Sequence, residues 1–160
     1  MRWHTLTRNI ELNIAVFALL LNFPWEILQA PLFVGMGGGT FIHAIKGCAQ
    51  GTLGDAVIIL LAYWTVSGVA ASRGWIVAPS FRQLALFIAI GVLITAAIEW
   101  LATRGHWVQS WVYSSAMPVV PGLGVGLSPL LQWVVLPPLV VWFVRRQLTA
   151  FLQVSAPTEN

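Results

Sequence analysis

The chain has very few charged side chains. Only 8% of its 160 residues are Asp, Glu, Lys or Arg, whereas 58% are hydrophobic, and an ordinary globular domain carries roughly a quarter charged residues. So few charges cannot cover the surface of a water-soluble domain. The formal net charge of +3 comes from scattered basic residues. Because no basic run is present, nucleic acid is excluded as a partner.

Cysteine is nearly absent as well. Cys48 is the only one, which excludes an intrachain disulfide and any metal site built from several cysteines. His43 and His106 are isolated, and no histidine pair or Glu-x-x-His unit has the spacing of metal ligands. Neither Cys48 nor the Ser114–Ser115 pair has an adjacent base that would make it a nucleophile. We therefore expect neither a metal nor a cofactor.

What the chain does have is four long apolar runs, at about 10–30, 52–71, 83–103 and 127–144. A helix needs about 20 apolar residues to cross a bilayer core roughly 30 Å thick. The runs predict an all-α integral membrane protein, a single domain (1–160) made of an antiparallel bundle of four transmembrane helices, with a disordered tail from about residue 152. The fourth run is the shortest, and three prolines predict a kink or an irregular stretch there: Pro129, Pro137 and Pro138.

The basic residues predict the orientation of the chain. With four spans, one side of the membrane carries both termini and the loop at 72–82, and the other carries the loops at 31–51 and 104–126. The first side holds Arg2, Arg8, Arg73, Arg82, Arg145 and Arg146, and the second holds only Lys46 and Arg104. The side rich in Lys and Arg is normally cytoplasmic. We expect a multi-pass protein of the inner (plasma) membrane with both termini in the cytoplasm and an uncleaved first helix.

Three acidic residues fall at nearly one depth. Glu26, Asp55 and Glu99 each lie three or four residues from the outer end of their run, roughly 5–6 Å below the outer boundary at about 1.5 Å per residue. Buried charges in membranes mark functional sites by default. We therefore predict an outward-facing polar pocket with these three carboxylates as catalytic groups. The expected substrate-binding residues are Asn22, Trp25, Gln29, Trp100, Arg104, His106, Trp107, Trp111, Tyr113 and Gln132.

Further polar residues accompany this set. Thr95 and Thr103 share a helix face with Glu99, and the loops are expected to bring His43, Gln50 and Gln109 to the same level. Trp107, Trp111 and Tyr113 have the spacing of one side of a short interfacial helix, either an aromatic belt or a lid hinged at "PGLGVG". That glycine string follows no strand, so it does not indicate a dinucleotide site.

Simpler explanations stay open for the acids. A carboxylate one turn below the interface can reach the headgroups, and Asp55 in "GTLGDA" has the position of a cap for the second helix. A pair between Glu26 and Arg104 would be purely structural.

The combination of acids and tryptophans suits one chemistry in particular. Removal from water raises the pKa of a carboxyl group, so that it holds a proton near neutrality, and tryptophan rings stabilise passing cations. Such a site suits protonation of an alkene. In general plan the chain resembles the small polytopic enzymes that isomerise, hydrate or cyclise isoprenoids, sterols or carotenoids. The matching features are the carboxylates Glu26, Asp55 and Glu99 and the stretch "IEWLATRGHWVQSWVY". The resemblance implies a lipophilic small-molecule substrate and membrane lipid as the surroundings.

Two other classes of function fit the same features. Protonatable groups in four helices suit a small proton- or metal-coupled transporter, and this would act as a homo-oligomer. Polar stripes on membrane helices also suit an accessory or assembly subunit that binds a partner membrane protein.

Overall fold

The structure is a computed structural model that describes residues 9–36 and 41–154, the last four of them by their backbone alone. Four helices dominate it: α2 (Ile10–Gln29), α3 (Phe41–Val69), α4 (Phe81–Ala102) and α5 (Leu127–Val154). Each is long and apolar enough to cross a membrane, and the described part of the chain contains no strand beyond two isolated bridges. This confirms the all-helical class and the four apolar helices, which are compatible with a polytopic membrane protein.

Two helices are longer than predicted. α3 begins at Phe41 instead of about residue 52, and α5 continues to Val154 instead of about residue 144. The fourth helix is therefore not the shortest, and it continues without a break through Pro137 and Pro138. The disordered tail predicted from residue 152 is wrong as far as Val154, and the remainder, 155–160, lies outside the described residues.

Local signals explain where two of the helices begin. The side chain of Asn9 accepts a hydrogen bond of 3.0 Å from the Leu12 N–H and caps α2. Ser80 and Gln83 form a reciprocal capping box at the start of α4. α2 ends in the short 3-10 helix η1 (Ala30–Leu32). A second one, η2 (Arg73–Val77), connects α3 to α4.

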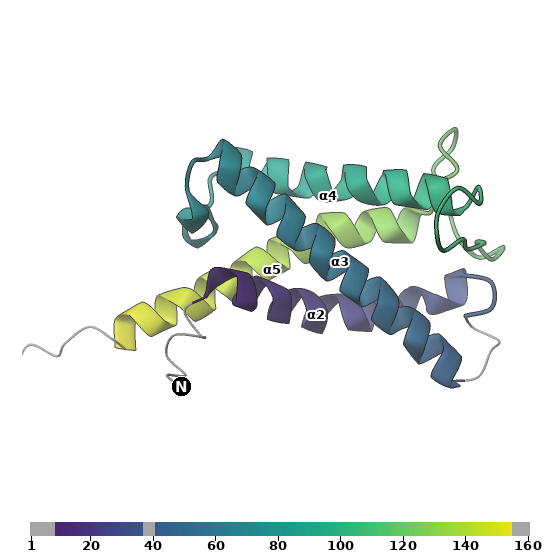
Figure 1. Cartoon of the computed structure of the whole chain (residues 1–160), viewed down its shortest axis with the longest axis horizontal. Coiled ribbons are helices and arrows are strands. Elements are labelled where there is room, and N and C mark those ends of the chain that lie inside the picture. The colour runs from purple at the N-terminus through teal and green to yellow at the C-terminus, as the bar shows by residue number, and fades with distance from the viewer. Residues whose placement is uncertain (1–8, 37–40, 155–160) are drawn as a thin grey trace, which may run out of the picture.

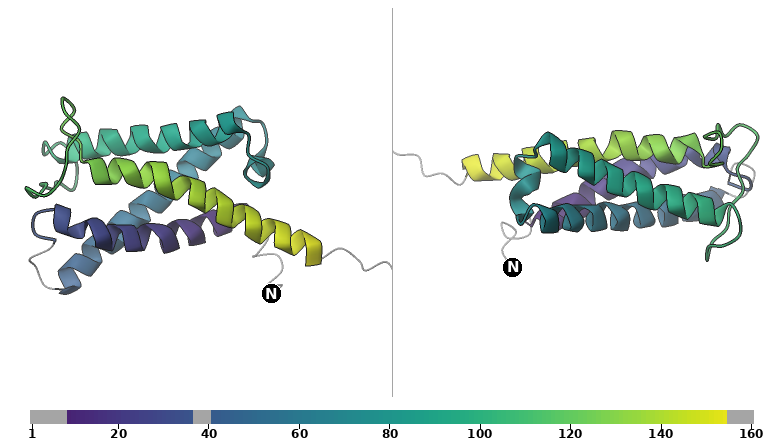
Figure 2. Two further views of the ribbon diagram at one scale, coloured as in Figure 1. Left: turned by 180° about the vertical axis from the view of Figure 1, so that it is seen from behind. Right: turned by 90° about the horizontal axis from the view of Figure 1, so that it is seen from above.

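The four helices form a ring in which α3 and α5 lie on opposite faces, as the front and back views show (Figures 1 and 2). α3 and α5 each pack against both α2 and α4. The connection from α2 to α3 and the connection from α4 to α5 meet at one end of the molecule, whereas η2 lies at the other (Figure 1). We call the first of these the loop end.

Tightly packed apolar side chains fill the half of the bundle that is remote from the loop end. Ile14, Ile59 and Val140 are fully buried there. Trp75 of η2 is inserted between the rings of Tyr63 and Phe87. Burial of this kind supplies most of the stability of a packed interior. The half near the loop end is packed differently, because polar side chains occupy its centre.

Glycine allows two close contacts between the helices. A Cβ atom added to Gly91 of α4 would lie 2.0 Å from Cε3 of Trp133 on α5, and one added to Gly51 of α3 would lie 2.5 Å from the Glu26 carboxyl group on α2. Real Cβ atoms do not approach other atoms so closely. Gly91 meets the ring of a fully buried tryptophan and therefore needs to be glycine, whereas at Gly51 the flexible Glu26 side chain would have to move. Gly51 lets α3 pass directly over the Glu26 carboxyl group.

Candidate functional site

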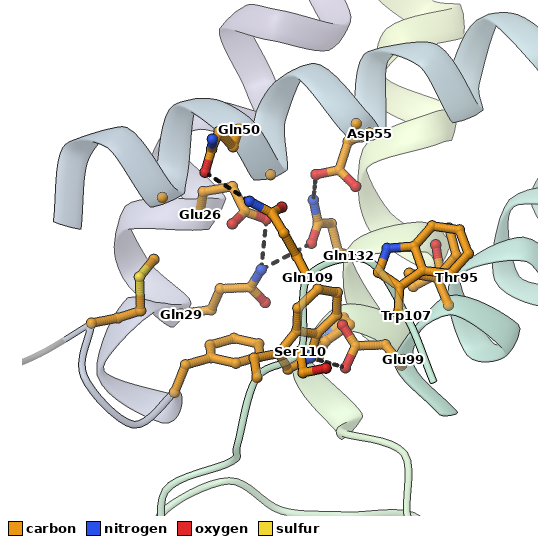
Figure 3. A pocket seen from close by; sticks show the side chains of 18 of the residues that line it. Glu26, Gln29, Gln50, Asp55, Thr95, Glu99, Trp107, Gln109, Ser110 and Gln132 are labelled. Carbon is orange, nitrogen blue, oxygen red and sulfur yellow. Dashed lines mark hydrogen bonds between the residues drawn. The ribbon is translucent and has the colours of Figure 1, made fainter. Parts of the chain in front are cut away.

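A cavity of about 670 Å³ lies at the loop end. All four helices contribute to its wall, together with the segments 33–36 and 107–111. Its volume falls within the range of about 300–1,000 Å³ that is typical of ligand-binding pockets. Figure 3 shows Glu26, Asp55 and Glu99 around it, each from a different helix.

A network of amide and carboxyl groups forms the bottom of the cavity. Gln132 of α5 is only 2% exposed. Its Nε2 donates to Oδ2 of Asp55 at 2.6 Å and to Oδ1 of Asn22 at 2.8 Å. Nε2 of Gln29 donates to Oε1 of Glu26 at 2.7 Å and to Oε1 of Gln132 at 3.4 Å (Figure 3). Side chains of α2, α3 and α5 are thereby joined inside the bundle.

The Glu26 and Asp55 carboxyl groups also lie next to each other, close enough to interact directly. Two carboxyl groups this close favour a state in which one of them carries a proton, because two negative charges side by side repel each other. The pair therefore presents an acid and a base side by side at the cavity wall. Asp55 lies in the middle of α3, so it does not cap that helix, and this simpler explanation of the residue does not hold.

Glu99 has different partners. The carboxyl oxygen Oε2 accepts a hydrogen bond of 3.1 Å from Nε1 of Trp111 and a second one from the Tyr113 hydroxyl. The Tyr113 hydroxyl in turn accepts from the Gly126 N–H at 2.9 Å. Glu99 is 6% exposed, which excludes a carboxylate that reaches out to the headgroups. Glu99 thus fastens the loop between α4 and α5 onto the bundle.

Tyr113 remains a hydrogen-bond donor over a wide pH range. Burial raises the pKa of its hydroxyl, and the neighbouring Glu99 carboxyl group raises it further. The pKa of Tyr113 is therefore higher in the folded protein than in the unfolded chain, where it is about 10. The resulting contribution to stability is complete below about pH 10 and is lost progressively as the pH rises from there through the raised pKa. We therefore expect this contact to be intact at all physiological pH values.

Removal of the Tyr113 hydroxyl should loosen the loop. We expect Tyr113→Phe to destabilise the protein by about 1–3 kcal/mol, because two hydrogen bonds of about 1 kcal/mol or more each are lost, and to speed amide hydrogen exchange in the peptide that spans 104–116. The matched control is Tyr63→Phe, because Tyr63 donates to the Arg73 carbonyl at the opposite end of the molecule. Equal exchange of the loop in the two variants would contradict the anchoring role of Tyr113.

The loop itself is irregular. The short interfacial helix predicted for Trp107, Trp111 and Tyr113 does not form. Instead, an isolated bridge pairs Tyr113 with Phe33, and Nε2 of Gln109 donates to Oε1 of Gln50 on α3 at 3.4 Å. Trp107 and Trp111 line the cavity. The segment 107–111 therefore forms part of the cavity wall, while a hinge at "PGLGVG" stays a prediction.

Several residues expected to bind substrate do not line the cavity. Trp25 is half-buried on α2, His106 is exposed in the loop, and Trp100 is 43% exposed. The Arg104 guanidinium lies 4.4 Å from the ring centre of Trp100 and donates to the carbonyls of Trp100 and Leu123. A pair between Arg104 and Glu26 is therefore not formed. Within the described residues, the salt bridge is between Arg73 and Glu11.

The other predicted residues gather at the cavity or directly below it. Gln29, Trp107, Trp111 and Gln132 line it, and Asn22 and Tyr113 support residues that do. His43 and Gln50 also line it, but from α3 rather than from a loop. Sequence reasoning missed the apolar wall residues Phe33, Met36, Ile58 and Ile98 and the cationic Lys46. Apolar residues in an apolar run carry no signal, whereas Lys46 stands out as the only lysine in the chain.

No group of three or more His, Cys, Asp or Glu side chains within the described residues is arranged to hold a metal ion. Comparison with known proteins finds no family model, no curated protein and no solved structure that matches the chain. A functional assignment consequently depends on the geometry of the site.

Proposed function

We propose that the protein is a membrane-embedded acid–base enzyme that isomerises, hydrates or cyclises a lipophilic, isoprenoid-like substrate. The observation that carries this proposal is the contact between the Glu26 and Asp55 carboxyl groups at the wall of a ligand-sized cavity. An acid next to a base is the arrangement that proton transfer needs. The rest of the wall is largely apolar and aromatic, as a lipophilic substrate requires.

The reaction would begin with transfer of the shared proton to a carbon–carbon double bond. The π electrons form the new C–H bond, one carboxyl group becomes a carboxylate, and the neighbouring carbon is left as a carbocation. Loss of a different proton to the carboxylate completes an isomerisation. Attack by water followed by loss of its proton completes a hydration, and attack by a second double bond followed by proton loss completes a cyclisation. In each case the proton returns to the pair.

Aromatic rings near the pair suit the cationic intermediate. Trp107 and Trp111 both line the cavity. The face of an indole ring attracts a cation within about 6 Å of its centre. The segment that carries these rings forms part of the cavity wall at the loop end, and its closure over a bound substrate would help to keep bulk water away from a reactive carbocation.

We further propose that the protein is a single antiparallel domain in the inner (plasma) membrane. Both of its termini would lie in the cytoplasm. In Figure 1 consecutive helices run in opposite directions between the loop end and the end with η2. Because six of the eight basic residues belong to the side of the termini, the loop end would face outward. The cavity would then open toward the outer face.

Reporter fusions test this orientation. Fusions after residues 40 and 115 should report an external location, and fusions after residues 78 and 150 a cytoplasmic one. A cytoplasmic signal at residue 115 would contradict the proposed orientation of the cavity.

The transport alternative has less support. The polar groups of the cavity end at Asn22 and Gln132, and the bundle beyond them is filled by the apolar core around Ile14, Ile59 and Val140. Within the described residues of one chain, the hydrogen bonds of the cavity therefore trace no polar path to the opposite end. An oligomer or a partner membrane protein would have to supply such a path.

Incorporation of solvent deuterium tests the enzymatic proposal for any substrate that is present in the native membrane. The purified protein would be incubated in D₂O with lipid vesicles made from an extract of that membrane. Mass spectrometry would then detect deuterium bound to carbon in the recovered lipids. The proposal expects such labelling of one lipophilic species, well above that in vesicles that contain heat-denatured protein. Absence of carbon-bound deuterium together with absence of any new product would contradict the proposal.

A further inference from the structure

Thr95 lies at the wall of the cavity, on α4, with an unusual property. It is 7% exposed, and its hydroxyl group is buried and has no hydrogen-bond partner. Other buried hydroxyl groups in these helices do have partners: Thr52 donates to the Cys48 carbonyl and Ser67 to the Tyr63 carbonyl, both at 2.8 Å. A buried polar atom without a partner costs stability and is rare. Thr95 is therefore a candidate for contact with a ligand.

The amides at the bottom of the cavity have no N–H group left to donate to Thr95. Gln132 uses both of its N–H bonds, on Asp55 and Asn22. Gln29 likewise donates to Glu26 and Gln132, and its Oε1 accepts from Ser128 at 2.9 Å. At the bottom of the cavity, the Thr95 hydroxyl and the oxygens of the carboxyl pair retain hydrogen-bonding capacity, and the Gln29 and Gln132 amide oxygens each retain one lone pair.

In the view of Figure 3, Thr95 and Glu26 lie on opposite sides of Gln132 and Asp55, and the Trp107 ring lies beside Thr95. Carboxyl oxygens from α2 and α3 therefore lie on one side of the cavity, and a hydroxyl group without a partner lies on the other, on α4. Threonine on a helix has two accessible χ1 rotamers, one of which bonds a carbonyl of the preceding turn; Thr52 makes such a bond, and Thr95 does not.

We propose that the cavity takes a lipophilic alcohol, whose hydroxyl group is bound between Thr95 and the Glu26–Asp55 pair; this deepens the proposed function and relies on the same site. A hydroxyl group suits this position because it can donate one hydrogen bond and accept another at the same time. It can donate to a carboxyl oxygen and accept from the Thr95 hydroxyl. The apolar remainder of the ligand would lie against the aromatic and aliphatic wall.

Binding of two matched probes tests this proposal. Farnesol and the hydrocarbon β-farnesene share an isoprenoid skeleton, and only farnesol has a hydroxyl group. Their affinities for the full-length protein in nanodiscs can be measured through quenching of tryptophan fluorescence, since Trp107 and Trp111 line the cavity. We expect farnesol to bind about tenfold more tightly than β-farnesene, since one good hydrogen bond is worth about that factor.

Three variants show whether Thr95 is responsible. Thr95→Val keeps the shape but removes the hydroxyl group, and it should reduce the preference for farnesol to about twofold or less. Thr95→Ser should retain most of the preference. Thr52→Val is the matched control, because Thr52 is equally buried but does not line the cavity, and it should bind both probes as the wild type does.

The melting temperature of the protein without probe provides a second readout. Because Thr95→Val removes a polar group that has no partner, its melting temperature should equal or exceed that of the wild type. A lower melting temperature would mean that the hydroxyl group has a structural partner, and would overturn the proposal. Equal affinity of the wild type for the two probes, or an undiminished preference in Thr95→Val, would also overturn it.

The outcomes separate this proposal from the enzymatic one. A Thr95-dependent preference for farnesol without carbon-bound deuterium would support the alcohol site and contradict the enzymatic proposal. Deuterium incorporation with no effect of Thr95→Val on binding would support the enzymatic proposal and contradict the alcohol site.

Discussion

Asp55→Asn and Glu26→Gln are each expected to lower the rate of solvent-deuterium incorporation by about 10²-fold or more, the usual effect of removing a general acid or base. Both changes keep the size of the side chain and most of its hydrogen bonds but remove the group that titrates. The two carboxyl groups act as one unit, because they are in direct contact. The double variant should therefore be little slower than either single variant.

Glu99→Gln is the matched control for these two variants. It makes the same chemical change at another buried carboxyl group that lines the same cavity. Because Glu99 is engaged by Trp111 and Tyr113, we expect its replacement to loosen the loop and to reduce the rate far less than the other two. Equal losses in all three variants, or full activity in Asp55→Asn, would show that the Glu26–Asp55 pair does not transfer the proton.

Gly91→Ala is expected to destabilise the protein more than alanine at any other glycine of the described helices. The new Cβ would lie 2.0 Å from Cε3 of Trp133, whose side chain is 1% exposed and has nowhere to move. α4 and α5 would have to separate, and overpacking of this kind costs about 1–3 kcal/mol and occasionally more. The measurement is the melting temperature of the purified protein in detergent.

The control for Gly91→Ala is Gly68→Ala. A Cβ added at Gly68 of α3 meets no atom within 4 Å, so this variant should be neutral or more stable, since alanine favours a helix by up to about 1 kcal/mol over glycine. Trp133→Phe removes the ring atoms that the new methyl group would meet. Combined with Gly91→Ala, it should recover part of the loss in a double-mutant cycle. Independent, additive effects of the two substitutions would contradict the close contact.

The prediction of the helices depended on properties that are local along the chain. Each long apolar run contains enough residues to cross a bilayer, and this is a matter of length and composition. The ends of the helices were less predictable. The polar start of α3, which carries His43, Lys46 and Gln50, lowers the local hydropathy, yet it is helical. Its glycines Gly47 and Gly51 contact Met36 and Glu26 closely, which is a tertiary effect.

Tertiary structure also decided the roles of the acids. The sequence singles out Glu26, Asp55 and Glu99, because carboxylates in apolar runs are rare and costly. It does not reveal that Glu26 and Asp55 contact each other while Glu99 holds Trp111 and Tyr113. Such partners are brought together by the crossing of α3 over α2 and by the path of an irregular loop, neither of which has a sequence pattern.

The depth of a residue along a membrane helix follows from its position in the run, because each residue advances the helix by about 1.5 Å. The sequence alone therefore determined the class of protein, the four helices and the level at which polar side chains collect. The direction in which a side chain points depends on which face of its helix packs against a neighbour. Gln132 faces the cavity, whereas Trp25 and Trp100, at similar predicted depth, do not. Only helix packing determines that direction, because it depends on contacts between residues far apart in the chain.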